Sequence, residues 1–175
     1  RKGDLNYITP EEINNFRPEY FFHLAATFER TKETYSSYNE NFHNNILLSN
    51  YLLKIFKNVT SLKKIIYASS YLIYDKNLYL TKKKNLKNYL LDENDRCNPR
   101  NLVGTSKLLH EKELNFISKH KKSLKIICVR IFRGYGCGSD DVISRWIRSC
   151  INNEQIKLYR KDGRFDYIYA KDTAD

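Results

Sequence analysis

The sequence predicts an α/β fold built on a doubly wound, mostly parallel sheet. Two observations lead to this prediction. Short apolar runs alternate along the chain with longer stretches whose apolar residues recur at helical spacing. Each of those stretches is long enough to return the chain to a parallel neighbouring strand. The length of 175 residues suits one domain, and no repeat of solenoid period is present.

The first half of the chain predicts two strands with a helix between them. Residues 20–25, which follow Pro18, are apolar and are expected to form a buried strand. A helix is expected over 41–56, where apolar residues recur three and four apart. Residues 64–69 are expected to form a second strand that ends in hydroxyl side chains, and a long polar loop follows.

A second crossover leads to the most apolar strand candidate. The spacing predicts a helix over 101–118 that frays in a lysine-rich cluster, and a strand over 124–132 follows it. A glycine-rich loop is expected at 134–138. Ligands of parallel sheets bind at the carboxyl ends of the strands. The residues directly after the predicted strands are therefore the first candidates for a functional site.

The C-terminal part predicts one more helix and two short strands. Asp140 or Asp141 is a suitable N-cap for a helix over 142–152. Strands are expected at 156–159 and 166–170, and the last residues resemble the first turn of a helix. Because the sequence does not begin with Met, we expect it to be a piece of a longer chain.

The chain is basic, with 31 Lys and Arg against 20 Asp and Glu and a formal net charge of +11. Such a balance is a feature of nucleic-acid-binding proteins. Here the densest clusters, 82–87 and 119–125, fall between apolar segments and are typical of solvated loops. Nucleic acid is therefore not expected as a partner, whereas anionic small molecules such as nucleotides would experience the same attraction.

The sequence lacks the features of membrane, secreted, disulfide-rich and metal-binding proteins. No apolar run approaches the roughly 20 residues of a membrane helix, and the N-terminus is not a secretory signal. No membrane partner is expected, and a cytoplasmic location is predicted. The four cysteines, at 97, 128, 137 and 150, form no CxxC pair, and the histidines form no HExxH-like pair. Neither a disulfide framework nor a metal site is predicted.

Six short motifs stand in order at the expected strand ends and helix starts. They are Pro18–Ala26, Asn44 with Asn50, Tyr67–Tyr74, Gly104–Leu108, Arg130–Gly136 and Phe165–Asp172. Together they resemble the extended short-chain dehydrogenase/reductase superfamily, in its NAD-dependent nucleotide-sugar epimerase/dehydratase family. The resemblance covers nearly the whole chain. It implies a Rossmann-like sheet, NAD or NADP as cofactor, a nucleotide-sugar substrate, and hydride transfer to and from a sugar carbon.

The same resemblance suggests how the chain is organised. Residues 1–136 would be the later part of the cofactor-binding domain, and 137–175 the start of a small substrate-binding region. The family's Gly-x-x-Gly-x-x-Gly loop, which binds pyrophosphate at a helix N-terminus, is not among these 175 residues. Homodimers through the two long helices are common in the family, so a homodimer is expected here.

The resemblance assigns cofactor-binding roles to residues that follow the first strand and to others farther along. They are Leu24, Ala25, Ala26, Asn44, Ser69, Lys107 and Phe132. Small side chains after the first strand would allow the cofactor ribose to approach closely. Asn44 would reach the active-site edge, although an amide on a helix surface is an equal alternative without the resemblance.

Catalytic roles are assigned to Ser70 and Lys107. Ser70, four residues before Tyr74, would hydrogen-bond the reacting sugar oxygen, although a serine that caps a local turn is the alternative. Lys107 would bind the nicotinamide ribose and lower the pKa of a neighbouring phenol. The family's catalytic tyrosine lies four residues before this lysine, where the chain has Val103. Valine cannot accept a proton, and Tyr71 is a possible substitute.

Substrate-binding roles fall on Arg133, Ile143, Arg145 and Tyr159. Arg133 stands where relatives carry a substrate-contacting asparagine and would grip a phosphate or carboxylate. A salt bridge to Asp140 or Asp141 is the alternative for Arg133, and a solvated basic face is the alternative for Arg145.

Three functions remain open. The leading one is a nucleotide-sugar epimerase-like enzyme. The competing class is a catalytically impaired binding or regulatory protein, which Val103 favours, and the third possibility is an enzyme of altered reaction with a substitute base. Tyr71 and Leu72 stand where 4,6-dehydratases carry acidic residues, which argues against that activity.

Overall fold

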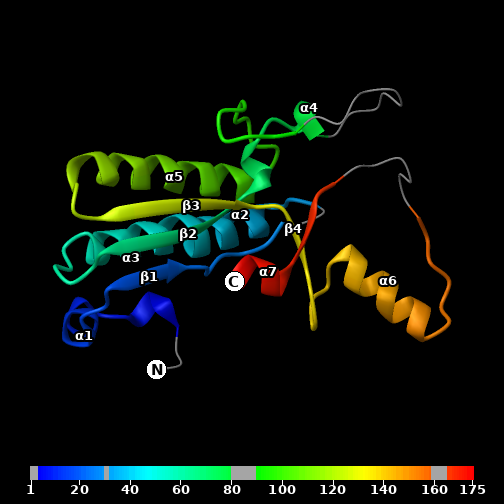
Figure 1. The fold of residues 1–175 in the computed structure, drawn as a ribbon, viewed down its shortest axis with the longest axis horizontal. Helices are drawn as coiled ribbons and strands as arrows, with labels where there is room; N and C mark the ends of the chain where they lie inside the picture. Colours follow the sequence, from blue (N-terminus) through cyan, green and yellow to red (C-terminus); the bar gives the residue numbers. More distant parts are fainter. Residues whose placement is uncertain (1–3, 30–31, 80–89, 159–164) are drawn as a thin grey trace. The chain divides into compact units, whose positions relative to one another are not determined.

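The computed structural model describes residues 4–29, 32–79, 90–158 and 165–175. These residues form two compact units (Figure 1). The first comprises residues 1–75 and 96–130, and the second comprises 76–95 and 131–175.

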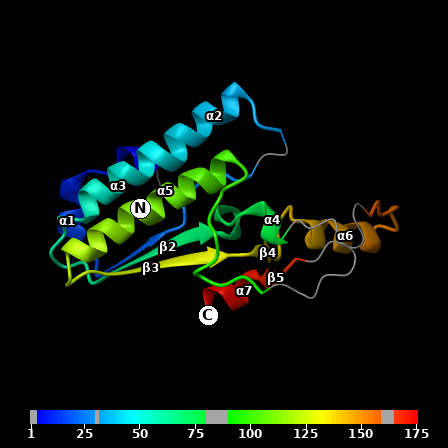
Figure 2. The same ribbon diagram turned by 90° about the horizontal axis from the view of Figure 1, so that it is seen from above.

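The first unit contains a three-stranded sheet in the order β1-β2-β3. The strands are β1 (Tyr20–His23), β2 (Lys64–Ser70) and β3 (Lys125–Ile131). β1 and β2 are parallel, with Tyr20 opposite Lys64 and His23 opposite Tyr67. Figure 2 shows that the arrows of β2 and β3 also point in the same direction. The prediction that 20–25, 64–69 and 124–132 form adjacent parallel strands is confirmed.

Helices cover one face of this sheet (Figure 2). Between β1 and β2 the chain forms α2 (Tyr35–Asn41), a π-helical turn η2 (Phe42–Leu47) and α3 (Leu48–Phe56), so the predicted helix begins six residues earlier than expected. The cause is local, because Thr34 accepts a hydrogen bond from the Ser37 backbone and Ser37 bonds back in a capping box.

The second long helix is α5 (Leu102–His120), close to the predicted bounds. The Asn101 side chain caps it by accepting a hydrogen bond from the Gly104 backbone N–H at 2.8 Å. Near the N-terminus lie the short turn η1 (Leu5–Tyr7) and α1 (Pro10–Phe16), which begins in a capping box of Thr9 and Glu12.

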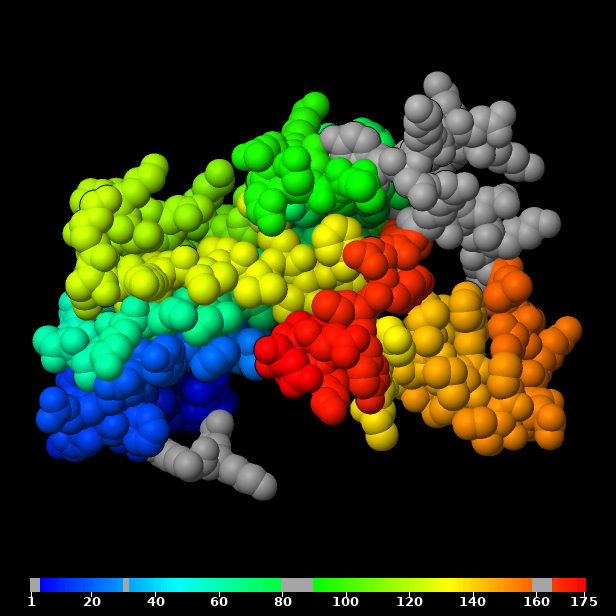
Figure 3. All heavy atoms as spheres, in the orientation of Figure 1, coloured from blue at the N-terminus to red at the C-terminus, as the bar shows by residue number. Residues whose placement is uncertain are grey.

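The core of the first unit lies between the sheet and these helices. Its most deeply buried residues are Leu52, Ile65, Leu114 and Leu124. The opposite face of the sheet is open and apolar: Phe22 is 60% exposed, and Tyr20, Ile127 and Val129 also face solvent. Figure 3 shows atoms of β3, in yellow, uncovered on that face.

The second unit holds a separate two-stranded parallel sheet of β4 (Arg133–Tyr135) and β5 (Tyr167–Tyr169). Its helices are α4 (Lys76–Tyr79), α6 (Val142–Ile151) and α7 (Ala170–Ala174). Asp141 caps α6 by accepting from the Ser144 backbone N–H at 3.0 Å, as predicted for one of the two candidate aspartates.

Two predictions for the second unit are wrong. The glycine-rich segment begins as β4 rather than as a loop, because its backbone pairs with β5. The strand expected at 156–159 does not form over its described residues, 156–158, which have no strand partner there. Apolar residues alone do not make a strand when no neighbour completes the hydrogen bonds.

No helix among the described residues is long and apolar enough to cross a membrane.

Candidate functional site

The start of α5 packs directly on the turn that follows β2. This turn is the short helix η3 (Tyr71–Ile73). Gly104 makes the close approach possible, because a Cβ atom there would lie 2.4 Å from the Leu72 carbonyl oxygen. Any larger side chain would push the helix away. The glycine therefore allows the first turn of α5 to lie against η3, while Lys107, one helical turn after Val103, contacts Ala68 of β2.

Two serines end β2 in different surroundings. The Ser70 hydroxyl oxygen accepts a hydrogen bond from the Leu72 backbone N–H at 3.2 Å. Ser70 therefore caps the local turn, which is the alternative given for it above. A hydroxyl that accepts one bond can still donate its own hydrogen to a ligand. Ser69 is buried, and its hydroxyl has no hydrogen-bond partner among the described residues.

Lys107 is a buried lysine on the inner side of α5. It is only 7% exposed, and its Nζ donates to the Ala68 carbonyl at 2.5 Å. The ammonium also lies 4.8 Å from the centre of the Tyr67 ring. Among the described residues no acidic side chain forms an ion pair with it. Burial therefore lowers the pKa of Lys107 to about 8.

A cluster of buried histidines lies next to Lys107. His23 of β1 bonds Ser49 at 2.9 Å, and its ring stacks edge-on against His110 of α5. Burial lowers the pKa of His23 to about 3, with smaller contributions from His110 and Lys107. Burial also lowers the pKa of His110, against the opposing effect of Glu113 at 2.9 Å. Both rings are therefore neutral near pH 7.

Val103, at the position of the family's catalytic tyrosine, is buried. Tyr71, the possible substitute for that tyrosine, is buried too. Val103 is 8% exposed and Tyr71 is 7% exposed. The next phenol along the turn, Tyr74, accepts a hydrogen bond from the Arg130 guanidinium at 3.0 Å. Arg130 in turn forms a bidentate pair with the buried Glu111.

The residues after β1 present an exposed, mostly small surface at the carboxyl end of the sheet. Leu24 is 64% exposed, Ala26 is exposed and Ala25 is half-buried. Because β1 and β2 are parallel neighbours, this surface lies beside Ala68 and the serines. Small side chains, a lysine amine held only by a backbone carbonyl and an unpaired buried hydroxyl fit the ribose and nicotinamide end of a dinucleotide.

Sequence reasoning missed a buried amide network near this surface. Asn45 donates to Asn41 at 2.6 Å and to Thr27 at 2.9 Å, and it accepts from the Thr27 backbone N–H at 2.8 Å. Ser106 of α5 donates to Asn41 at 3.2 Å. Asn44, the predicted amide, is half-buried and lies outside these contacts. The i,i+4 spacing of Asn41 and Asn45, which places both amides on one helix face, is the sequence feature that could have indicated this network.

The predicted substrate-binding residues, and the cofactor candidate Phe132, belong to the second unit. Arg133 places its guanidinium 3.9 Å from the centre of the Phe165 ring, and its Nε has no hydrogen-bond partner among the described residues. The alternative salt bridge to Asp140 or Asp141 is not formed. Asp140 pairs with Arg148 instead, and Asp141 caps α6.

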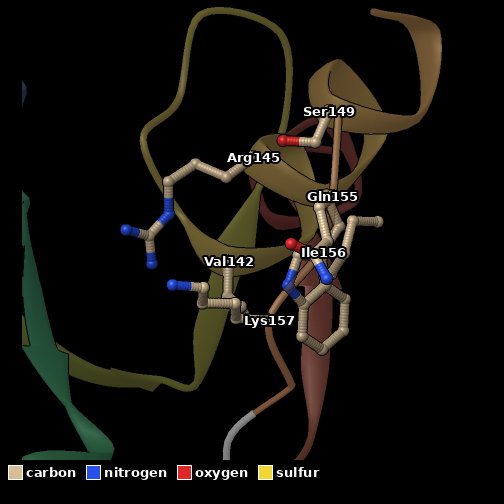
Figure 4. A pocket seen from close by; sticks show the side chains of 7 residues that line it. Val142, Arg145, Ser149, Gln155, Ile156 and Lys157 are labelled. Carbon is tan, nitrogen blue, oxygen red and sulfur yellow. The ribbon is translucent and has the colours of Figure 1, made fainter. Parts of the chain in front are cut away.

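A pocket of about 250 Å³ lies beside α6 in this unit. It is lined by Val142, Arg145, Trp146, Ser149, Gln155, Ile156 and Lys157. In Figure 4 the ends of Arg145 and Lys157 lie on the same side of the pocket. Two cations next to an indole and an apolar wall suit an anionic, aromatic ligand such as a nucleotide. Ile143 is half-buried on α6, and Tyr159 lies outside the described residues.

Solved structures share this fold. UDP-glucuronic acid 4-epimerase from Bacillus cereus, in complex with UDP-glucuronic acid and NAD, is 20% identical with a TM-score of 0.78, over 98% of this chain and 51% of that chain. UDP-N-acetylglucosamine 4-epimerase from Methanobrevibacter ruminantium M1, in complex with UDP-N-acetylmuramic acid, is 26% identical with a TM-score of 0.74, over 99% and 54%.

A third structure, UDP-N-acetylglucosamine 4-epimerase from Bacillus cereus, is 25% identical with a TM-score of 0.72, over 99% of this chain and 56% of that chain. The chain thus spans about half the length of these enzymes. A search of curated proteins finds no match. The sequence profile of the NAD dependent epimerase/dehydratase family matches residues 6–175. The chain belongs to the NAD-dependent epimerase/dehydratase family.

Proposed function

We propose that the protein is a nucleotide-sugar epimerase that binds NAD and acts by transient hydride transfer at a sugar carbon. The observation that carries the proposal is the approach of α5 to the Ser70 turn, which Gly104 permits. The start of α5 lies against Leu72, which bonds Ser70, and Lys107 bonds the Ala68 carbonyl at the carboxyl end of the same strand. The related enzymes crystallised with NAD and UDP-sugars support the choice of cofactor and substrate class.

Each residue has a proposed task. The Ser70 hydroxyl donates a hydrogen bond to the reacting sugar oxygen, and Lys107 binds the cofactor ribose beside Ala25 and Ala26. NAD, when bound, supplies a reversible hydride acceptor. In the second unit, Arg145 and Lys157 beside the α6 pocket bind an anionic nucleotide group.

The proposal includes a cytoplasmic location, where activated sugars are made, and a homodimer. Exposed apolar side chains on the two long helices support the dimer: Leu47 and Tyr51 on one, Leu109 and Phe116 on the other. An outward-facing apolar helix surface of this kind suits a second copy of the chain. We also propose that the cofactor-binding domain ends at residue 136 and that the substrate-binding region begins after it.

The second candidate function is a catalytically impaired binding or regulatory protein of the same fold. Val103 favours it, because no phenol stands one turn before Lys107. Turnover of a panel of UDP-sugars, by protein from the complete reading frame, separates the two. Ordinary turnover supports an enzyme, and cofactor binding without turnover supports the second candidate.

Two variants sharpen this comparison. Val103→Tyr restores a phenol on the inner face of α5 and is expected to raise any measurable rate by about 10²-fold or more. Tyr71→Phe removes the buried phenol of the turn and abolishes turnover if Tyr71 is the substitute base. A rate that neither variant changes would contradict both assignments and would leave the proton to another group.

A further inference from the structure

Lys107 combines three features that are unusual for one lysine. Its side chain is buried, its amine is held by a single backbone carbonyl, and its surroundings contain no acidic partner among the described residues. A lysine in such surroundings readily loses its proton and serves as a base or nucleophile.

The neighbours of Lys107 explain why its charge is not offset. β2 contributes the ring of Tyr67, β1 contributes the neutral His23, and α5 itself contributes the neutral His110. The two nearby carboxylates of α5 are engaged elsewhere. Glu111 is held by Arg130 at 2.9 Å, and Glu113 is held by His110 and Asn50, each at 2.9 Å.

The other groups near the Ser70 turn are poor proton acceptors. Val103 has no basic atom, and the Tyr71 phenol carries its own proton, which it must lose before it can accept another. The Tyr74 phenol is a hydrogen-bond acceptor for Arg130. The Ser70 hydroxyl is far too weak a base near neutral pH.

We propose that Lys107, as a neutral amine, is the group that accepts the proton of the sugar hydroxyl in this protein. This inference rests on the proposed function and extends it. The sugar O–H bond breaks and its proton binds the Lys107 amine, which becomes an ammonium. The C–H bond breaks, its electron pair leaves as hydride to oxidised nicotinamide, and the C–O bond becomes a carbonyl. In the reverse step the ammonium returns the proton as hydride is delivered to the other face of the sugar.

The first test measures the titration of Lys107 without relying on activity. Protein from the complete reading frame, with ¹³C-labelled lysine, is titrated by NMR, and the Lys107 signal is assigned by its loss in Lys107→Arg. Lys112, exposed on the same helix, is the matched control through Lys112→Arg. We expect the Lys107 signal to titrate near pH 8, well below the ordinary range of a lysine side chain. A Lys107 signal that titrates together with Lys112 would overturn the inference.

The second test separates a proton acceptor from a residue that only binds ribose. Arginine keeps the positive charge and the donors but does not lose its proton. We expect Lys107→Arg to lower kcat by about 10²-fold or more, with a smaller change in the calorimetric affinity for NAD. Adding Val103→Tyr to this variant should restore part of kcat, since a phenol then accepts the proton. An unchanged kcat with a raised KM for NAD would show that Lys107 only binds the cofactor.

Calorimetry keeps the two hypotheses distinguishable. If protein from the complete reading frame binds neither NAD nor a UDP-sugar, the proposed function fails and the inference fails with it. If both ligands bind and Lys107 titrates like Lys112, only the inference fails. Circular dichroism of each variant confirms that the fold is kept.

Discussion

Acid is expected to unfold this protein through His23. The side chain is 2% exposed, and burial holds its pKa at about 3, far below the ordinary value of 6.5. In the unfolded chain the same imidazole takes up a proton near pH 6.5. The unfolded state therefore binds more protons as the pH falls, so folding stability falls from about pH 6.5 downward toward pH 3.

The size of the effect follows from the two pKa values. Each pH unit between them costs about 1.4 kcal/mol, because one proton is bound only in the unfolded state. Between pH 7.5 and pH 5 the loss from His23 alone is about 2 kcal/mol. The lowered pKa of His110 acts in the same direction. Lys107 contributes little over this interval, since it is protonated below about pH 8 in both states.

The assay is urea unfolding followed by circular dichroism at several pH values. His23→Asn removes the titrating ring and should flatten the pH dependence by about 2 kcal/mol, whatever its cost at pH 7.5. His43→Gln, which replaces an exposed histidine, is the matched control. Parallel curves for the original protein and His23→Asn would refute the reasoning, because the buried ring would then not be the group that titrates.

Three further outcomes are expected. Gly104→Ala should destabilise the protein by about 1–3 kcal/mol in urea unfolding, because its Cβ would meet the Leu72 carbonyl oxygen; unchanged stability would contradict the close packing of α5 on the turn. Glu111→Gln should cost about 3 kcal/mol in the same assay by leaving Arg130 without its carboxylate, and a loss under about 0.5 kcal/mol would show that the pair is not important for folding. The 175-residue chain should bind NAD weakly or not at all in calorimetry, because it contains no glycine-rich pyrophosphate loop; micromolar affinity would contradict this.

The sequence by itself determined the alternation of strands and helices in the first unit. Periodicity is a local signal, because the spacing of apolar residues within a segment predicts whether that segment forms a strand or a helix. Caps are local too, which is why Asn101 and Asp141 could be read as helix starts within a few residues. The roles of Ser70 and Lys107, by contrast, were assigned by the family resemblance of the motifs and not by periodicity.

The amide network shows where local reasoning stops. The π-helical turn at 42–47 inserts extra backbone into the helix and rotates the residues around it. Asn41 and Asn45 face the buried side, as their i,i+4 spacing allows, whereas the predicted Asn44 is half-buried. The buried face is decided by contacts with Thr27 and Ser106, which lie outside the local sequence of the helix.

The state of Lys107 was decided only by the tertiary structure. The sequence shows a lysine on a helix, where the ordinary expectation is a solvated ammonium. Whether its charge is offset depends on residues brought from β1 and β2 and on carboxylates already held by Arg130 and His110. Burial and electrostatic neighbours are properties of a three-dimensional arrangement, so the chemistry of this amine becomes visible only when the strands and helices are packed together.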